Sequence, residues 1–166
     1  MENSINNIIL SMINYNSPDV KRINHALKVF QFSEIIANLE EVTVNELTVI
    51  KICGILHDIG IHEAEIKYKS SSGKYQEIEG PKIAEELLVK NKIDISNTQI
   101  ERIKFIIGNH HSYKKIDGID FQILVEADFI VNIYEDNIQK REIENVKKNI
   151  FKTNTGKYLI DSMYLK

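Results

Sequence analysis

Histidine and aspartate residues recur along this chain in an order suited to holding a divalent metal ion. The pair His57–Asp58 lies in the string CGILHDIG, with His25 upstream and Asp128 far downstream. Neutral imidazole and ionised carboxylate together bind iron, manganese, zinc or magnesium. These four residues therefore indicate a metal site, provided that the fold brings them together.

Helical spacing supports convergence of these residues in the interior. His57 follows Ile50 by seven residues and Cys53 by four, and Asp128 follows Phe121 by seven. Residues with these spacings share one face of a helix, so both polar side chains are expected to lie on apolar, core-facing stripes. His110 and His111 continue a third such stripe.

Asp128 provides the sharpest argument for a cation. A buried carboxylate costs free energy unless it is paired or binds a metal ion. No Lys or Arg lies between Lys115 and Lys140, so no cationic partner is available nearby in the chain. Each residue alone has an ordinary interpretation, as a hydrogen-bonded core histidine, a helix cap or a salt-bridge partner. The joint pattern favours a metal.

The elements that must position these residues are predicted to be helices almost throughout. Apolar residues recur at helical spacing, and no alternating pattern of strands competes with them. Capping signals mark three helix starts: Ser17–Pro18–Asp19, Thr43 with Glu46, and Ser96 with Gln99. The expected helices cover about residues 5–13, 18–39, 44–60, 81–91, 97–110, 120–134, 138–151 and 155–165, with residues 61–80 irregular.

Composition sets the wider bounds. With 166 residues, 43% hydrophobic and 27% charged, the chain is expected to form one compact all-α domain over residues 1–166. A net charge of −3 carries no electrostatic signature of a nucleic-acid partner. The single Cys53 excludes a disulfide framework and favours a reducing, cytoplasmic location. No secretory signal or apolar run of about 20 residues is present, so no membrane partner is expected.

The ordered pattern of His25, then His57–Asp58, then Asp128 resembles the HD superfamily of metal-dependent phosphohydrolases. The string HDIG is common among its bacterial members, and ILVEADFIVN is similar to the helix that bears the closing aspartate. The resemblance covers about residues 19–135. It implies a helical HD fold with a central metal site, hydrolysis of a phosphate ester or anhydride, and His25, His57, Asp58 and Asp128 as metal ligands.

The resemblance also implies candidates for a second metal or for phosphate binding. His110, alone or with His111, matches the position at which two-metal members place further ligands. Glu79 stands where those members have a histidine, and a carboxylate can replace imidazole at iron or manganese. One or two divalent ions are expected, with iron or manganese favoured and magnesium, zinc, nickel or cobalt open. Asp58 and His110 are the candidate catalytic residues, using hydroxide that the metal generates.

Departures from the family pattern narrow the substrate. The string GYP is absent, which argues against hydrolysis of cyclic dinucleotides. Ile61–His62 stands where guanosine tetraphosphate hydrolases have a Glu–Asp pair. His62 has the wrong helical phase for the ligand set, and we interpret it as a loop residue.

Residues 66–79 are predicted to form a mobile flap over the metal. Lys67, Lys69 and Lys74 would meet phosphate charge there, and Tyr68 and Tyr75 would stack on a base. The alternative is an ordinary solvated loop.

Two functions follow from the sequence. The first is a metal-dependent phosphohydrolase, a phosphomonoesterase or phosphodiesterase, acting on a nucleotide or another small phosphorylated metabolite. The second is a catalytically idle HD-fold module for regulation or protein interaction. Such modules typically lose ligands, whereas this chain keeps the whole set, which favours the enzyme. The oligomeric state is open, a homodimer included.

Overall fold

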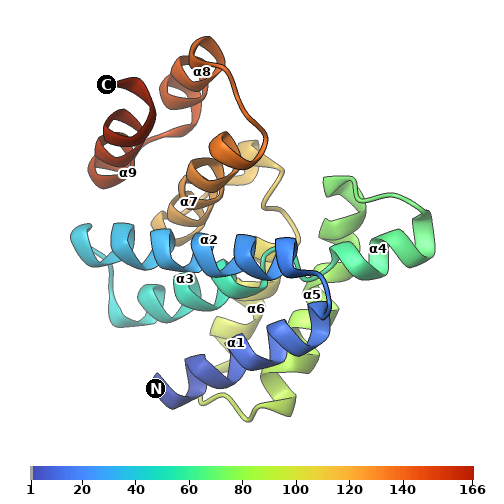
Figure 1. The fold of residues 1–166 in the computed structure, drawn as a ribbon. Coiled ribbons are helices and arrows are strands. Elements are labelled where there is room, and N and C mark those ends of the chain that lie inside the picture. Colours follow the sequence, from blue (N-terminus) through green and yellow to red (C-terminus); the bar gives the residue numbers. More distant parts are fainter. Residues whose placement is uncertain (1) are drawn as a thin grey trace.

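The computed structural model describes the backbone of residues 2–166 and the side chains of residues 4–166. This part of the chain is helical and contains no strand, which confirms the predicted all-α class (Figure 1). No helix within it is both long and apolar enough to cross a membrane. The elements are α1 (Glu2–Asn16), α2 (Val20–Leu39), α3 (Val44–Leu56), α4 (Ile61–Tyr68), α5 (Gly73–Lys90), α6 (Asn97–Ile107), η1 (Tyr113–Lys115), α7 (Ile119–Glu135), α8 (Lys140–Ile150), α9 (Asn154–Ile160) and η2 (Asp161–Leu165).

The centre of the fold is formed by α2, α3 and α7, which pack against one another. Figure 1 shows α2 and α3 side by side, with α4 and α5 on one side and α8 and α9 on the other. Helix α7 is buried along most of its length, and α3 buries eight of its residues. Because His25, His57, Asp58 and Asp128 lie on these three helices or just after them, the core also sets the positions of these site residues.

Helix starts follow the predicted capping chemistry in two of three places. Thr43 and Ser96 each form the predicted capping box, at the starts of α3 and α6. At α2 the prediction is off by two residues. Asp19, rather than Ser17, is the cap, because its Oδ1 accepts from the backbone N–H of Arg22 at 3.1 Å.

The prediction that residues 61–80 are irregular is wrong. Helix α4 begins at Ile61 directly after the HDIG string, and α5 begins at Gly73 instead of Pro81. The buried positions of α5 include Gln76, Gly80 and Ala84, at intervals of four residues. This is a helical stripe, but an amide and a glycine occupy two of its places, so hydrophobic periodicity could not reveal it.

Both glycines near the HD string have close neighbours, which are main-chain atoms at Gly60 and a side-chain methyl at Gly80. A Cβ on Gly60 would lie 2.5 Å from the carbonyl oxygen of Gln76 and 2.7 Å from the backbone nitrogen of Gly80. A Cβ on Gly80 would lie 2.8 Å from a methyl group of Ile107. A side chain at Gly60 would not fit at such distances. The turn after His57–Asp58 therefore packs directly against the main chain of α5.

Candidate metal centre

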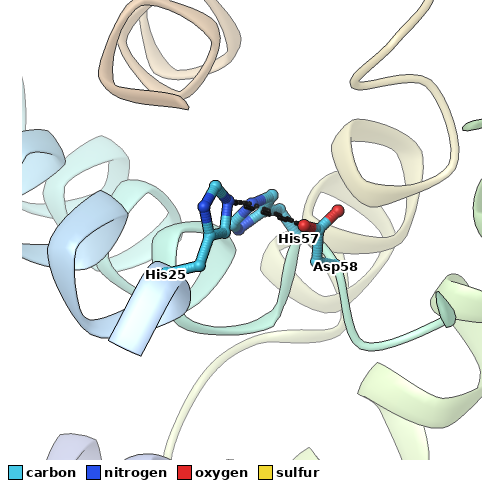
Figure 2. A group of neighbouring side chains, drawn as sticks. All are labelled: His25, His57 and Asp58. Carbon is cyan, nitrogen blue, oxygen red and sulfur yellow. Dashed lines mark hydrogen bonds and ion pairs between the residues drawn. The ribbon is translucent and has the colours of Figure 1, made fainter. Parts of the chain in front are cut away.

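Four of the predicted ligands meet at the centre of the fold. His25 Nε2 lies 3.1 Å from His57 Nε2, 3.2 Å from Asp128 Oδ1 and 3.5 Å from Asp58 Oδ2. Figure 2 shows the two imidazole rings and the Asp58 carboxylate pointing toward one another. Ligand atoms of His25, His57 and Asp58 all lie within 4.8 Å of one another.

These four side chains come from three separate stretches of the core. His25 lies inside α2, His57 and Asp58 follow the end of α3, and Asp128 lies in the middle of α7. His25, His57 and Asp128 are buried, as helical spacing predicted, with 7%, 0% and 8% of their surface exposed. Asp58 is partly exposed, with 24% of its side-chain surface open, while its Oδ2 lies 3.5 Å from His57 Nε2.

The orientation of the histidine rings is set by their Nδ1 atoms. His57 Nδ1 lies 3.1 Å from the carbonyl oxygen of Gly54, and His110 Nδ1 lies 2.8 Å from that of Ile107. A carbonyl oxygen can only accept, so each Nδ1 carries a hydrogen and each Nε2 faces the interior. His25 Nδ1 faces a carboxylate, Glu135, in the same way.

This arrangement fits a cation. With hydrogen on both Nδ1 atoms, neutral His25 and His57 rings would direct two lone pairs at each other across 3.1 Å. Such an approach requires a proton or a metal ion between the rings and the neighbouring carboxylates. Burial by itself lowers the pKa of His25, but the hydrogen bond and charge of Asp128 and the charge of Asp58 outweigh it and raise the pKa to about 9. The site therefore attracts positive charge.

The two carboxylates stay ionised in this setting. Burial raises the pKa of Asp58, but the charge of His57 and the hydrogen bond from His110 lower it well below its ordinary range. Burial also raises the pKa of Asp128, but the hydrogen bond that it shares with His25 and the charge of His57 outweigh burial and lower this pKa. Two anionic oxygen donors and two imidazoles are a donor set that suits iron, manganese or zinc.

A second group of ligand atoms adjoins the first. Asp58, His110 and His111 each offer an atom within 4.8 Å of the others, and Asp58 belongs to both groups. Asp58 Oδ1 lies 3.3 Å from His110 Nε2. His111 Nε2 lies 3.0 Å from Gln76 Oε1, which comes from the first turn of α5. The structure thus brings His110 and His111 to the predicted place, with an amide as their neighbour.

The contacts of Glu79 lie elsewhere. Its carboxylate accepts from Lys67 Nζ at 2.7 Å and from the Tyr68 hydroxyl at 2.8 Å, which ties α5 to α4. Among the described residues, no hydrogen bond or ion pair joins Glu79 to the histidines. The hydrogen bond from Lys67 is the main cause of its lowered pKa.

The predicted substrate-binding lysines are partly committed to other contacts. Lys67 pairs with Glu63 as well as with Glu79, Lys69 donates to the carbonyl oxygen of Ile66, and Lys74 lies over the Tyr75 ring. Tyr68 and Tyr75 stack on each other with ring centroids 4.3 Å apart. In this conformation neither face between the two rings is open to a base. His62, predicted to be a loop residue, is an exposed residue of α4.

Sequence reasoning missed three polar residues around the cluster. Asn132 donates to Asp128 Oδ1 at 2.9 Å, Glu135 contacts His25, and Gln76 contacts His111. A signal for two of them was present, since Asn132 and Glu135 follow Asp128 by four and seven residues and so share its helix face. No comparable signal marked Gln76.

A cavity of about 440 Å³ opens onto the cluster. His25 and Asp58 form part of its wall, so the cluster is accessible from solvent on this side. Its lining is polar, with Ile61 the apolar member. The remaining lining residues are Asp19, Lys21, Arg22, Ser71, Gln76, Asn132, Glu135 and Asp136.

Comparison with known proteins identifies the fold and the family. A family model for the HD domain matches residues 22–149, most of the chain. The chain belongs to the HD domain family. Its structure is similar to the crystal structure of a predicted HD superfamily hydrolase from an uncultured Thermotogales bacterium, with a TM-score of 0.66 and 21% identity over 99% of this chain and 85% of that one. A search of curated proteins finds no match.

Membership of the HD domain family confirms the resemblance drawn from the sequence and supports a metal-dependent hydrolase. HD domains imply a divalent metal, and the buried cluster of this HD domain offers the donors that such an ion requires. The family match spans α2 through α7 and reaches α8, so it contains both groups of ligands.

Proposed function

We propose that this HD domain is a metal-dependent phosphohydrolase that cleaves a phosphate ester or anhydride of a nucleotide or another small phosphorylated metabolite. The observation that carries the proposal is the convergence of His25, His57 and Asp58 within 4.8 Å, at the wall of an open cavity. These residues and Asp128 would hold the first divalent ion. His110 and His111, with Asp58, would hold a second ion or the substrate phosphate.

A divalent ion in this site would lower the pKa of a water molecule toward about 7 and neutralise charge on phosphoryl oxygens. Side chains of the protein would orient the attacking water and transfer protons. Asp58 is an ionised acceptor at the cavity wall, placed to orient the attacking water. His110 Nε2 lies 3.3 Å from Asp58, so it would hold or pass a proton beside that water.

Two cationic side chains in the cavity lining would help to bind a phosphorylated substrate. Arg22 lines it and is fixed by Glu65 at 2.6 Å and by Asp19 at 3.3 Å, while Lys21 is exposed at the same wall. These two cations would meet phosphate oxygens that the metal does not contact. Amides and hydroxyls would bind the remainder of the molecule by hydrogen bonds. A polar metabolite therefore suits this wall, and a base would be held by hydrogen bonds rather than by stacking.

The test is a panel of phosphate esters and anhydrides, screened for phosphate release with manganese, iron, magnesium, zinc, nickel and cobalt. The panel should contain nucleoside monophosphates, a dinucleoside polyphosphate, sugar phosphates and a phosphodiester. A His57→Ala protein is the control for contaminating activity. Metal-dependent release that is lost in the variant supports the proposal. Stoichiometric metal without any turnover would favour the idle module.

A further inference from the structure

His25 differs from the other buried histidines in how its ring is held. His57 and His110 lie at the ends of helices, and each Nδ1 reaches the carbonyl oxygen three residues earlier, Gly54 and Ile107 respectively. Carbonyls in the last turn of a helix have no partner within the helix, so they are free to accept. His25 lies inside α2, where the helix itself uses the carbonyls. It needs an acceptor from elsewhere.

Glu135, the last residue of α7, supplies that acceptor. Its Oε2 lies 3.0 Å from His25 Nδ1, and its Oε1 accepts from Lys28 Nζ at 2.6 Å. The Glu135 side chain is 12% exposed, while Lys28 is on the surface. Both carboxylate oxygens are therefore engaged, and the contact joins α2 to α7 across the cluster.

The charge of Glu135 determines which nitrogen of His25 carries hydrogen. Glu135 forms an ion pair with Lys28, whose Nζ lies 2.6 Å from Oε1, so its carboxylate faces a cation on one side and the His25 ring on the other. An ionised carboxylate can only accept, so the His25 Nδ1 must donate. His25 Nε2 then faces His57 and Asp128 with the lone pair that a metal ligand needs.

We propose that Glu135 is a positioning residue that fixes the ring orientation and tautomer of His25, with Lys28 holding its second oxygen. The inference rests on the proposed function in taking a divalent cation as the ligand of His25. Carboxylates that hold a ligating histidine raise its basicity, and their loss typically lowers metal affinity about 10–100-fold. Glu135→Ala should weaken Mn²⁺ binding to that extent.

The experiment measures the Mn²⁺ dissociation constant of the full chain by titration calorimetry, with melting in EDTA as a measure of folding. Glu144→Ala is the matched control, because Glu144 is an exposed glutamate on α8. Formate is then added to the Glu135→Ala protein, where it can enter the space left by the carboxylate. We expect formate to recover several-fold of the lost affinity in this variant and none in the wild type or the control.

The outcomes separate this role from a merely structural one. A Glu135→Ala protein that binds Mn²⁺ within twofold of wild type rejects the inference while leaving the metal site in place. Weaker binding with a matching loss of melting temperature in EDTA and no response to formate also rejects it. If Glu135→Ala does not fold, Glu135→Gln removes the negative charge and keeps the shape of the side chain. Unchanged Mn²⁺ affinity in the Glu135→Gln protein counts against the inference. A wild-type protein that binds no Mn²⁺ rejects the proposed function itself.

Discussion

Asp58 and His110 lie 52 residues apart in the chain and meet across 3.3 Å, between Oδ1 and Nε2. The other oxygen of the same carboxylate, Oδ2, lies 3.5 Å from the Nε2 atoms of both His25 and His57. One side chain therefore serves two groups of ligands. A change at Asp58 should disturb both groups at once, whereas a change at His57 or at His110 acts first on its own group.

Substitutions at the HD pair test the first group. His57→Ala and Asp58→Ala should both purify with little metal and lose activity, because each removes a donor that faces His25. Elemental analysis after anaerobic preparation with iron or manganese measures the metal content. His62→Ala is the matched control, since His62 is an exposed histidine five residues further along. Full metal occupancy in His57→Ala would show that this histidine is not a ligand.

Metal removal should lower the melting temperature. A ligand that binds only the folded state at 100 times its Kd stabilises it by about 2.7 kcal/mol. In a domain of this size each kcal/mol corresponds to about 2–4 °C, so EDTA should lower Tm by about 5–10 °C relative to saturating Mn²⁺. Scanning fluorimetry with and without the ion measures the shift. The His57→Ala protein should show almost none, and an equal shift there would point to binding elsewhere.

The burial of two candidate ligands was predictable from the sequence because of their positions on helices. His57 and Asp128 continue apolar stripes on helices, so spacing alone placed them in the interior, and both are buried. Glu135 was not predictable, since a polar residue at the end of a helix is ordinarily solvated. Its role depends on His25, 110 residues earlier in the chain. The spacing of residues within one helix cannot predict a contact between two helices so far apart in the chain.

The missed first part of α5, residues 73–80, had a similar cause. Helix α5 buries Gln76 and Gly80 toward the HD turn, so its inward face carries little hydrophobic signal. Pro81 then gave the signal of a helix start, although it lies inside the helix. Lys67 could be paired with Glu63 by its spacing of four residues, whereas its contact with Glu79 required knowing that α4 and α5 pack together.

Gln76→Glu should strengthen the second group of ligands. The amide oxygen of Gln76 lies 3.0 Å from His111 Nε2, so a carboxylate there adds a negative charge beside His110 and His111. At several ångströms and an effective dielectric near 20, such a charge favours a cation by more than about 1.4 kcal/mol, or tenfold in affinity. A titration of Gln76→Glu with Mn²⁺ should then show a lower dissociation constant for the second ion than the wild type shows. Gln139→Glu on the surface provides the control, and unchanged stoichiometry and affinity would argue against a second ion.

Neutralising Lys67, Lys69 and Lys74 together tests the predicted flap. Loss of charge that meets the substrate phosphate should raise KM far more than it alters metal content or melting temperature. Lys67→Met alone should change KM little, because Lys67 already pairs with Glu63 and Glu79. Steady-state kinetics on the best substrate of the panel gives the comparison. Unchanged kinetics in the triple variant would identify residues 66–79 as an ordinary surface segment.

The contact between Gly60 and Gly80 fixes one dimension of the cavity. Ile61 and Gln76 both line it. Ile61 follows Gly60 directly, and the carbonyl oxygen of Gln76, one helical turn before Gly80, lies 2.5 Å from where a Cβ on Gly60 would stand. Main-chain atoms have no alternative rotamers, so side-chain rearrangement cannot change the spacing between the HD turn and α5 when a bulkier ligand arrives. Adaptation to substrate size must therefore come from side chains that line the cavity, such as the exposed Lys21.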